Sequence, residues 1–158
     1  MNGLNEGADR VQNELSRRGF AHTVVELPDS ARTAQEAADA IGCEVAQIAK
    51  SIIFRVKETD RPLLVVASGV NRINEKRLGK ALDLKLGKAD ADFVRERTGF
   101  VIGGVSPIGH KEALMTVIDE DLLQYGQVWA AAGHPKAVFK LKPEELIAMT
   151  GGQVMPIG

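Results

Sequence analysis

The sequence predicts one α+β domain in which a mixed β-sheet is flanked by helices. Its 158 residues match the size of a single domain, and residues 1–158 contain no repeat, linker or low-complexity tract. Short β-branched runs occur among amphipathic segments without the regular strand–helix alternation of a doubly wound sheet. The chain is 44% hydrophobic but only 4% aromatic, so we expect a core of Val, Ile, Leu and Ala.

The first third of the chain predicts two helices and a strand. Residues 5–18 carry apolar side chains four positions apart and stop at Gly19, as an amphipathic helix does. Residues 22–27 form a β-branched run that ends at Pro28 and Asp29, which predicts a strand and a turn. Thr33 to Glu36 has the pattern of a capping box and opens an alanine-rich helix that stops before Gly42.

The middle of the chain predicts a hairpin and two helices. Residues 48–56 and 62–68 are apolar runs joined by a short charged turn, which indicates two paired strands. Asn74 can cap a helix that extends to Leu82. Residues 92–98 indicate a shorter helix that ends at a glycine.

The last third predicts three strands and a helix. Residues 114–118 form a strand followed by the acidic turn 119–121, and residues 128–132 and 137–141 are strands on either side of a Gly-His-Pro sequence. Residues 142–150 have proline in the first turn and glycine just after the end, which is the signature of a helix at both termini.

Composition limits the partners and the compartment. With 20 basic and 21 acidic side chains the net charge is −1, whereas proteins that coat nucleic acid are clearly basic, so we expect no DNA partner. No apolar run reaches the roughly 18 residues of a membrane helix, and the first residues are polar and acidic, so we expect no membrane partner. Cys43 is the single cysteine and cannot form an intramolecular disulfide. These features predict a cytoplasmic protein.

The sequence gives no indication of a metal or cofactor. The common motifs of serine hydrolases, P-loops and zinc proteases are absent, and His22, His110 and His134 are scattered along the chain. We expect Cys43 to be a small buried hydrophobe rather than a nucleophile.

Three features could carry chemistry. Lys50 lies in an apolar strand, where it either points to water or is held in a pocket as an oriented donor. Gly103 and Gly104 follow an apolar run and precede Pro107; their amides could bind an oxyanion or phosphate, or the segment could be a structural turn. His134 could donate a hydrogen bond or cap a hairpin turn.

A basic segment lies between residues 71 and 88 and contains six basic and two acidic side chains. It is either the solvated face of a helix or a surface that faces phosphates. The six basic residues are Arg72, Lys76, Arg77, Lys80, Lys85 and Lys88.

Three segments in this order resemble the YbaK/ProX family of trans-editing aminoacyl-tRNA deacylases, which also occurs as a domain of bacterial prolyl-tRNA synthetases. They are IAKSIIF around Lys50, LLVVASGVNRINEKRL at 63–78 and GFVIGGVSPIGH at 99–110. The resemblance extends over residues 20–155. It implies a mixed sheet that closes partly toward a barrel, and hydrolysis of the ester that joins a wrong amino acid to tRNA, typically tRNA-Pro.

The resemblance also implies roles for residues. Lys50 matches the essential lysine of the family, and the amides of Gly103 and Gly104 would stabilise the oxyanion, so neither a metal nor a cofactor is required. It further implies Ile102, Val105, Ser106, Pro107 and His134 for the aminoacyl pocket, and Arg72, Lys76, Arg77 and Lys80 for the tRNA acceptor end.

Substrate and partners follow from the same resemblance. The segment AAAGHPKAVFKL departs from the late motif of cysteine-editing members, and apolar residues beside the glycine loop favour a small side chain such as alanine. We expect aminoacyl-tRNA as substrate, with a prolyl-tRNA synthetase or elongation factor contributing to specificity. The alternatives are a non-catalytic module that binds tRNA or a synthetase, and a hydrolase of another small activated ester.

Overall fold

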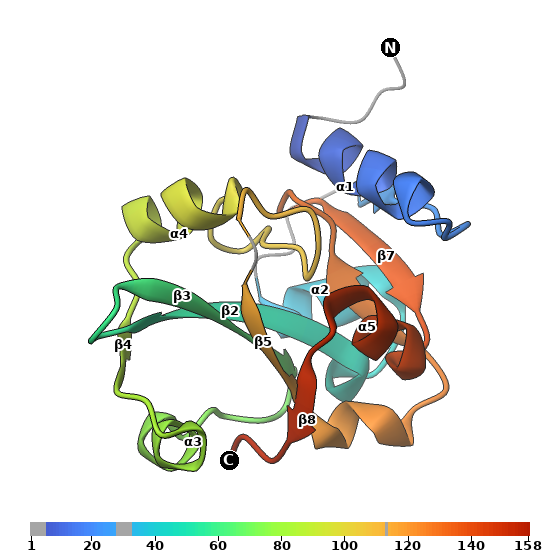
Figure 1. The fold of residues 1–158 in the computed structure, drawn as a ribbon. Helices are drawn as coiled ribbons and strands as arrows, with labels where there is room; N and C mark the ends of the chain where they lie inside the picture. Colours follow the sequence, from blue (N-terminus) through green and yellow to red (C-terminus); the bar gives the residue numbers. More distant parts are fainter. Residues whose placement is uncertain (1–5, 28–32, 113) are drawn as a thin grey trace.

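The computed structural model describes residues 6–27, 33–112 and 114–158, and the strands of these residues form one eight-stranded mixed sheet (Figure 1). The strand order is β1-β7-β6-β2-β3-β5-β8, and β4 pairs with β2 beside this path. The predicted α+β class with a mixed sheet is confirmed. The sheet is an open path from β1 to β8 and does not close into the barrel toward which the resemblance points. The strands are β1 Val25–Glu26, β2 Ile48–Val56, β3 Arg61–Ser68, β4 Leu86–Lys88, β5 Met115–Asp119, β6 Val128–Ala131, β7 Ala137–Leu141 and β8 Gln153–Met155.

The hairpin of β2 and β3 is the centre of the sheet. The two strands pair antiparallel from Ala49↔Ser68 to Val56↔Arg61, as the two apolar runs predict. Successive side chains of β3 enter different clusters: Leu63 and Val65 pack on the face that α3 covers, and Leu64 and Val66 pack on the opposite face. Because both faces are covered, β3 is a continuous apolar run rather than an alternating one.

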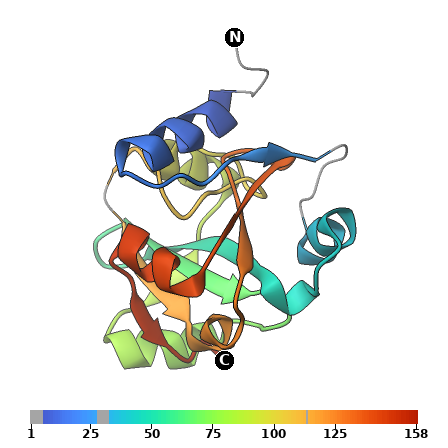
Figure 2. The same cartoon turned by 90° about the vertical axis from the view of Figure 1, so that its right-hand side faces the viewer.

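The helices cover different parts of the sheet. On one face α1 and α5 lie next to each other, since the Arg18 guanidinium that follows α1 donates to the carbonyl of Met149 in α5. Figure 2 shows α2 on the opposite side of the molecule from α5. The helices are α1 Glu6–Arg17, α2 Ala34–Ile41, α3 Glu75–Leu82, α4 Ala91–Thr98 and α5 Pro143–Thr150, with the 3₁₀ segments Val45–Gln47 and Glu120–Gln124.

The predicted helix caps are confirmed. Thr33 and Glu36 form the capping box of α2, and Asn74 accepts a hydrogen bond from the Arg77 N–H at the start of α3. Gly42 and Gly99 both have a φ of 85°, the left-handed conformation that ends a helix with little strain for glycine.

The strand predicted for residues 22–27 is wrong in its extent, because only β1 forms there. The side chain of Gln12 in α1 binds the backbone of this segment instead: its amide donates to the His22 carbonyl, and its oxygen accepts from the Val24 N–H. The turn predicted at Pro28 and Asp29 lies outside the described residues. The short strands β4 and β8 were not predicted. In the part of the chain that the structure describes, no helix is long and apolar enough to cross a membrane.

Candidate active site

The sheet has a gap on one edge of β2. At the beginning of β2, Ile48 and Ala49 pair with β6, and from Phe54 onward the strand pairs with β4. Between them, residues 50–53 pair with β3 on one side, and no described strand pairs with them on the other. The sheet therefore exposes a short strand edge in its middle rather than at its border.

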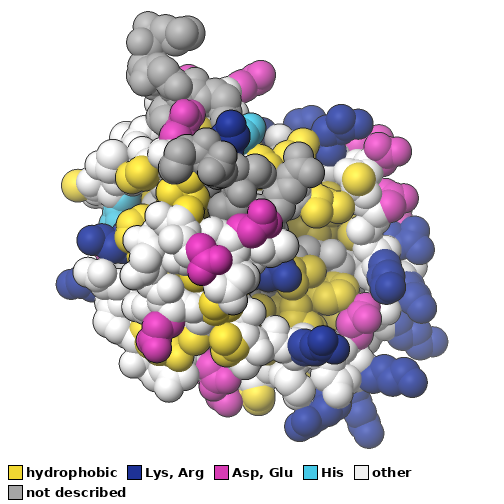
Figure 3. Space-filling view, turned by 180° about the vertical axis from the view of Figure 1, so that it is seen from behind, with side chains coloured by type: hydrophobic (Ala, Val, Ile, Leu, Met, Phe, Trp, Pro, Cys, Tyr) yellow, Lys and Arg dark blue, Asp and Glu magenta, His cyan; other side chains and the backbone are white. Residues whose placement is uncertain are grey.

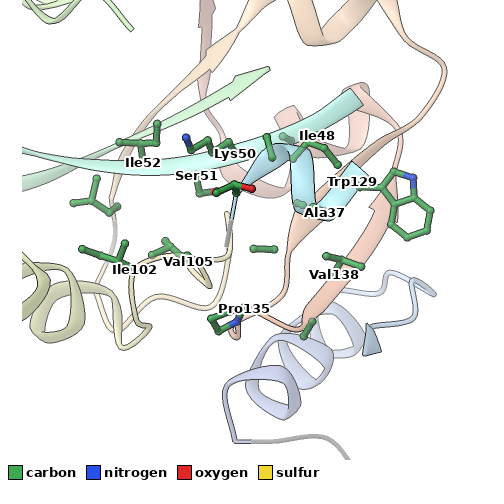
Figure 4. A pocket seen from close by; sticks show the side chains of 18 of the residues that line it. Ala37, Ile48, Lys50, Ser51, Ile52, Ile102, Val105, Trp129, Pro135 and Val138 are labelled. Atoms are coloured by element: carbon green, nitrogen blue, oxygen red, sulfur yellow. The ribbon is translucent and has the colours of Figure 1, made fainter. Parts of the chain in front are cut away.

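A cavity of about 530 Å³ opens at this gap (Figure 4). Its walls come from β2, α2, β6, β7 and the loop after α4. Among the described lining residues there is no aspartate or glutamate, and Thr33, Lys50, Ser51 and Gly103 supply polar groups. The other lining residues are apolar: Ala34, Ala37, Ile48, Ala49, Ile52, Ile53, Ala89, Val94, Ile102, Val105, Trp129, Ala130, Ala131, Pro135, Ala137 and Val138.

Lys50 and Ser51 leave β2 on opposite faces, as strand geometry requires. Figure 4 shows Ser51 on the side of β2 that faces Val105 and Pro135, and Lys50 extending along the other side. Lys50 is exposed and its ammonium has no partner among the described residues. Both residues line the cavity, because the cavity extends around the open strand edge.

The glycine loop begins with a tight turn. The Gly104 N–H donates to the Val101 carbonyl at 3.0 Å, and Gly103 has a φ of 89°. A positive φ at the third position is what a type II turn requires, which explains a glycine there. Gly103 lines the cavity and its N–H has no acceptor among the described residues. The Gly104 N–H, in contrast, is already used within the turn.

Gly104 has a different role. A Cβ at this position would lie 2.7 to 2.9 Å from three backbone atoms of His134. The glycine loop and the Gly-His-Pro turn are thus in direct backbone contact, and two segments that the sequence singled out separately meet beside the cavity. Only a residue without a side chain permits this approach.

His134 forms the turn and does not line the cavity. Its Nδ1 accepts from the Lys136 N–H at 3.0 Å, and its carbonyl accepts from the Ala137 N–H at 3.0 Å. Pro135, the next residue, lines the cavity instead. This arrangement corresponds to the turn cap that was the alternative role for His134.

Ser106 and Pro107 also lie away from the cavity. Ser106 is fully buried, and its hydroxyl accepts from the Ile108 N–H at 3.2 Å. Pro107 lines a second, polar hollow together with Arg10 and His110. Of the residues implied for the pocket, Ile102 and Val105 are therefore the two found in its wall.

His110 is neutral at ordinary pH. Burial lowers its pKa to about 4, against the hydrogen bond between its Nε2 and the Ser106 carbonyl at 2.6 Å, which favours the protonated form. Arg10 and Arg18 lower the pKa further. His110 faces the second hollow, so it supports the loop rather than the cavity at the sheet gap.

Residues 72–80, which include the first part of α3 and are called the α3 segment below, carry four basic side chains. All four are exposed and none of them lines the cavity. Arg72, Lys76, Arg77 and Lys80 form no ion pair with a described carboxylate. Seen from behind, Lys and Arg side chains gather on the side of the hollow that lies over α3 and β4 (Figure 3). Lys50 shares its face of β2 with Phe54, which packs in the same cluster as Leu78 of α3. Lys50 and the α3 segment are thus on one face of the sheet.

In the described part of the chain, no group of three His, Cys, Asp or Glu side chains is placed so that it could hold a metal ion. Burial raises the pKa of the Cys43 thiol, which packs beside Ile48 and α2. The thiol is therefore less ionised than an ordinary cysteine at neutral pH.

Sequence reasoning did not single out Ser51, Pro135 or the open edge of β2. For Ser51 a signal existed: the residue after Lys50 on a strand must face the other side of the sheet. The gap itself depends on where β4 and β6 begin to pair, and no local pattern gives that.

Comparison with known proteins matches residues 28–149 to the aminoacyl-tRNA editing domain. The YwhH protein of Bacillus subtilis is 34% identical over 136 residues, which are 86% of either chain. EbsC of Enterococcus faecalis, provisionally named as a Cys-tRNA(Pro)/Cys-tRNA(Cys) deacylase, is 29% identical over 79% of this chain and 76% of its own. A crystal structure provisionally described as a trans-editing enzyme for prolyl tRNA synthetase is 47% identical, with a TM-score of 0.93 over 98% of both chains.

Proposed function

Because this chain belongs to the aminoacyl-tRNA editing domain family, we propose that it hydrolyses the ester of a small amino acid, alanine above all, wrongly attached to tRNA-Pro. The resemblance of its motifs to the YbaK/ProX deacylases is confirmed by the same matches. The observation that carries the proposal is the cavity at the gap in β2, where Lys50 and the Gly103 amide, neither with a partner among the described residues, border one apolar hollow.

The chemistry needs few groups. Water attacks the ester carbonyl, the tetrahedral intermediate collapses, and the ribose oxygen leaves with a proton, giving free amino acid and tRNA. The Gly103 N–H would stabilise the oxyanion, since it borders the cavity and no described residue accepts from it. Lys50 would bind the terminal ribose or phosphate on the α3 face and so hold the ester across the strand edge.

The size and polarity of the cavity support a small apolar side chain. Ala130, Ala137 and Val105 line the cavity with small side chains, and its described wall offers no carboxylate for a polar substrate. An apolar pocket also rejects a side chain that merely adds a hydroxyl only weakly, by a factor of about a hundred. Serine and cysteine esters are therefore expected to be hydrolysed more slowly rather than excluded.

The α3 segment is proposed as the surface for the acceptor end of the tRNA. Arg72, Lys76, Arg77 and Lys80 are exposed, unpaired with described carboxylates, and lie on the face of Lys50. Such contacts to phosphates are weakened by salt. A prolyl-tRNA synthetase or an elongation factor would contribute the remaining specificity for tRNA-Pro.

The test measures ester loss from Ala-, Ser-, Cys- and Pro-tRNA-Pro incubated with the protein. Lys50→Ala should lower the rate on Ala-tRNA-Pro by about a hundredfold, the scale of a lost positioning contact. Lys111→Ala is the matched control, because Lys111 is also exposed but borders the second hollow. Binding of tRNA without hydrolysis of any of the four esters would replace this function by that of a non-catalytic module.

A further inference from the structure

We infer that Ser51 recognises the α-ammonium group of the aminoacyl ester, a role that rests on the proposed function and specifies how its substrate is held. The Ser51 hydroxyl is buried, lines the cavity and has no hydrogen-bond partner among the described residues. A buried polar group without a partner is rare and costs stability. A ligand group that fills this position would supply the missing partner.

The main chain of Ser51 points to the same place. The Ile48 carbonyl accepts from the Gly69 N–H on the β3 side, and paired residues of an antiparallel ladder alternate in the direction of their backbone groups. The even-numbered residues of β2 therefore bond to β3, and the N–H and carbonyl of Ser51 face the open edge. No described strand meets them there, because the pairing of β2 with β6 ends at Ala49 and its pairing with β4 starts at Phe54.

The other polar side chains of the described wall are either already hydrogen-bonded or positively charged. The Thr33 hydroxyl belongs to the capping box of α2, where it accepts from the Glu36 N–H and donates to the Glu36 carboxylate. Lys50 is a cation and repels an ammonium. With no described carboxylate in the wall, the Ser51 hydroxyl is the polar side-chain group of the described wall that can accept and has no hydrogen-bond partner, and it lies next to the Ser51 carbonyl.

Every aminoacyl ester carries this ammonium group, whatever its side chain. An ammonium that donates to the Ser51 hydroxyl and carbonyl is anchored at the strand edge, and its Cα then directs the side chain toward the apolar wall and the ester toward the glycine loop. Ser51 is in this sense a positioning residue. Because it fixes the Cα of the substrate, the apolar wall can discriminate between side chains by their size.

The experiment compares alanyl-tRNA-Pro with lactyl-tRNA-Pro, which has a hydroxyl in place of the ammonium and is otherwise of the same shape. The wild type should have the higher kcat/KM on the alanyl ester after subtraction of uncatalysed hydrolysis. Ser51→Ala should reduce this preference about tenfold, the scale of a hydrogen bond to a charged group, while the rate on the lactyl ester changes little. Ser51→Thr retains a hydroxyl and should retain the preference.

Thermal unfolding separates recognition from a structural role. Since the hydroxyl has no partner in the part of the chain that the structure describes, its removal in Ser51→Ala should leave Tm unchanged or raise it. A lower Tm with equal slowing of both esters, or an unchanged preference in Ser51→Ala, would overturn the inference while leaving the deacylase function in place. A wild type that hydrolyses neither ester would overturn the function as well.

Discussion

The contact between Gly104 and the backbone of His134 predicts that Gly104→Ala damages both stability and activity. The new Cβ would lie 2.7, 2.8 and 2.9 Å from three backbone atoms of His134. Carbon atoms are most stable at about 3.5–4.0 Å, so the loop and the turn must separate by roughly half an ångström or more. Backbone atoms cannot rotate away as the end of a side chain can.

The magnitudes follow from this displacement. Overpacking of this kind costs about 1–3 kcal/mol, which for a chain of this size lowers Tm by roughly 3–10 °C. Gly103 and Val105, on either side of Gly104, line the cavity, so the same movement shifts its wall. A displacement approaching 1 Å can cost about a hundredfold in rate, and we expect a loss in kcat that approaches this scale.

Gly126→Ala is the matched control. A Cβ at Gly126 meets nothing within 4 Å, and its φ is not in the left-handed region, so this variant should be neutral or slightly more stable. Thermal unfolding and single-turnover hydrolysis of Ala-tRNA-Pro, measured on both variants, check the prediction. If Gly104→Ala matched Gly126→Ala in Tm and rate, the loop–turn contact would not be what fixes the cavity.

Two further predictions concern charge. The pKa of His110 is about 4 in the folded protein and near 6.5 when unfolded. Between these values the unfolded chain binds a proton that the folded protein does not. The free energy of unfolding is therefore at its full value above pH 6.5, and about 3 kcal/mol of it is lost as pH falls from 6.5 through 4. Urea unfolding of His110→Asn from pH 7 to 4 should show a flatter decline than the wild type; parallel curves would contradict the assignment. Lys76→Glu with Lys80→Glu should weaken tRNA binding and lower the slope of log affinity against log salt by about one to two. Lys111→Glu should leave that slope unchanged, and equal slopes in all three proteins would exclude the α3 segment as the tRNA surface.

Local patterns predicted the elements that depend on neighbours in sequence. The capping box at Thr33, the Asn74 cap and the β2–β3 hairpin are all set by residues close in the sequence: three positions apart in the caps, and from Val56↔Arg61 out to Ala49↔Ser68 in the hairpin. All three are confirmed. The strand expected at 22–27 shows the limit of this approach. Its β-branched residues favour a strand, but Gln12 of α1 takes the hydrogen bonds of the segment. That contact is tertiary and leaves no local trace.

In the site, too, the sequence predicted what depends on local context and missed what depends on tertiary contacts. Lys50 and Gly103 were found from their unusual context, a charge in an apolar strand and glycines after one, and both border the cavity. The pocket role expected for His134 and Ser106 came from the resemblance, yet both side chains bond to nearby backbone. Which residue of a turn faces a cavity depends on how two distant strands meet, and here Pro135 faces it instead.

The interrupted pairing of β2 explains how one short strand can serve two chemically different parts of a substrate. Adjacent residues of a strand point to opposite faces, so Lys50 lies with the basic α3 segment and Ser51 with the apolar wall. In a continuous sheet these two faces would be separated by the next strand. Because β4 and β6 leave residues 50–53 uncovered, the proposed substrate would cross the edge here, with its anionic RNA on one face and its aminoacyl group on the other. Extending β6 by two paired residues would close this passage without altering any of the side chains that border it.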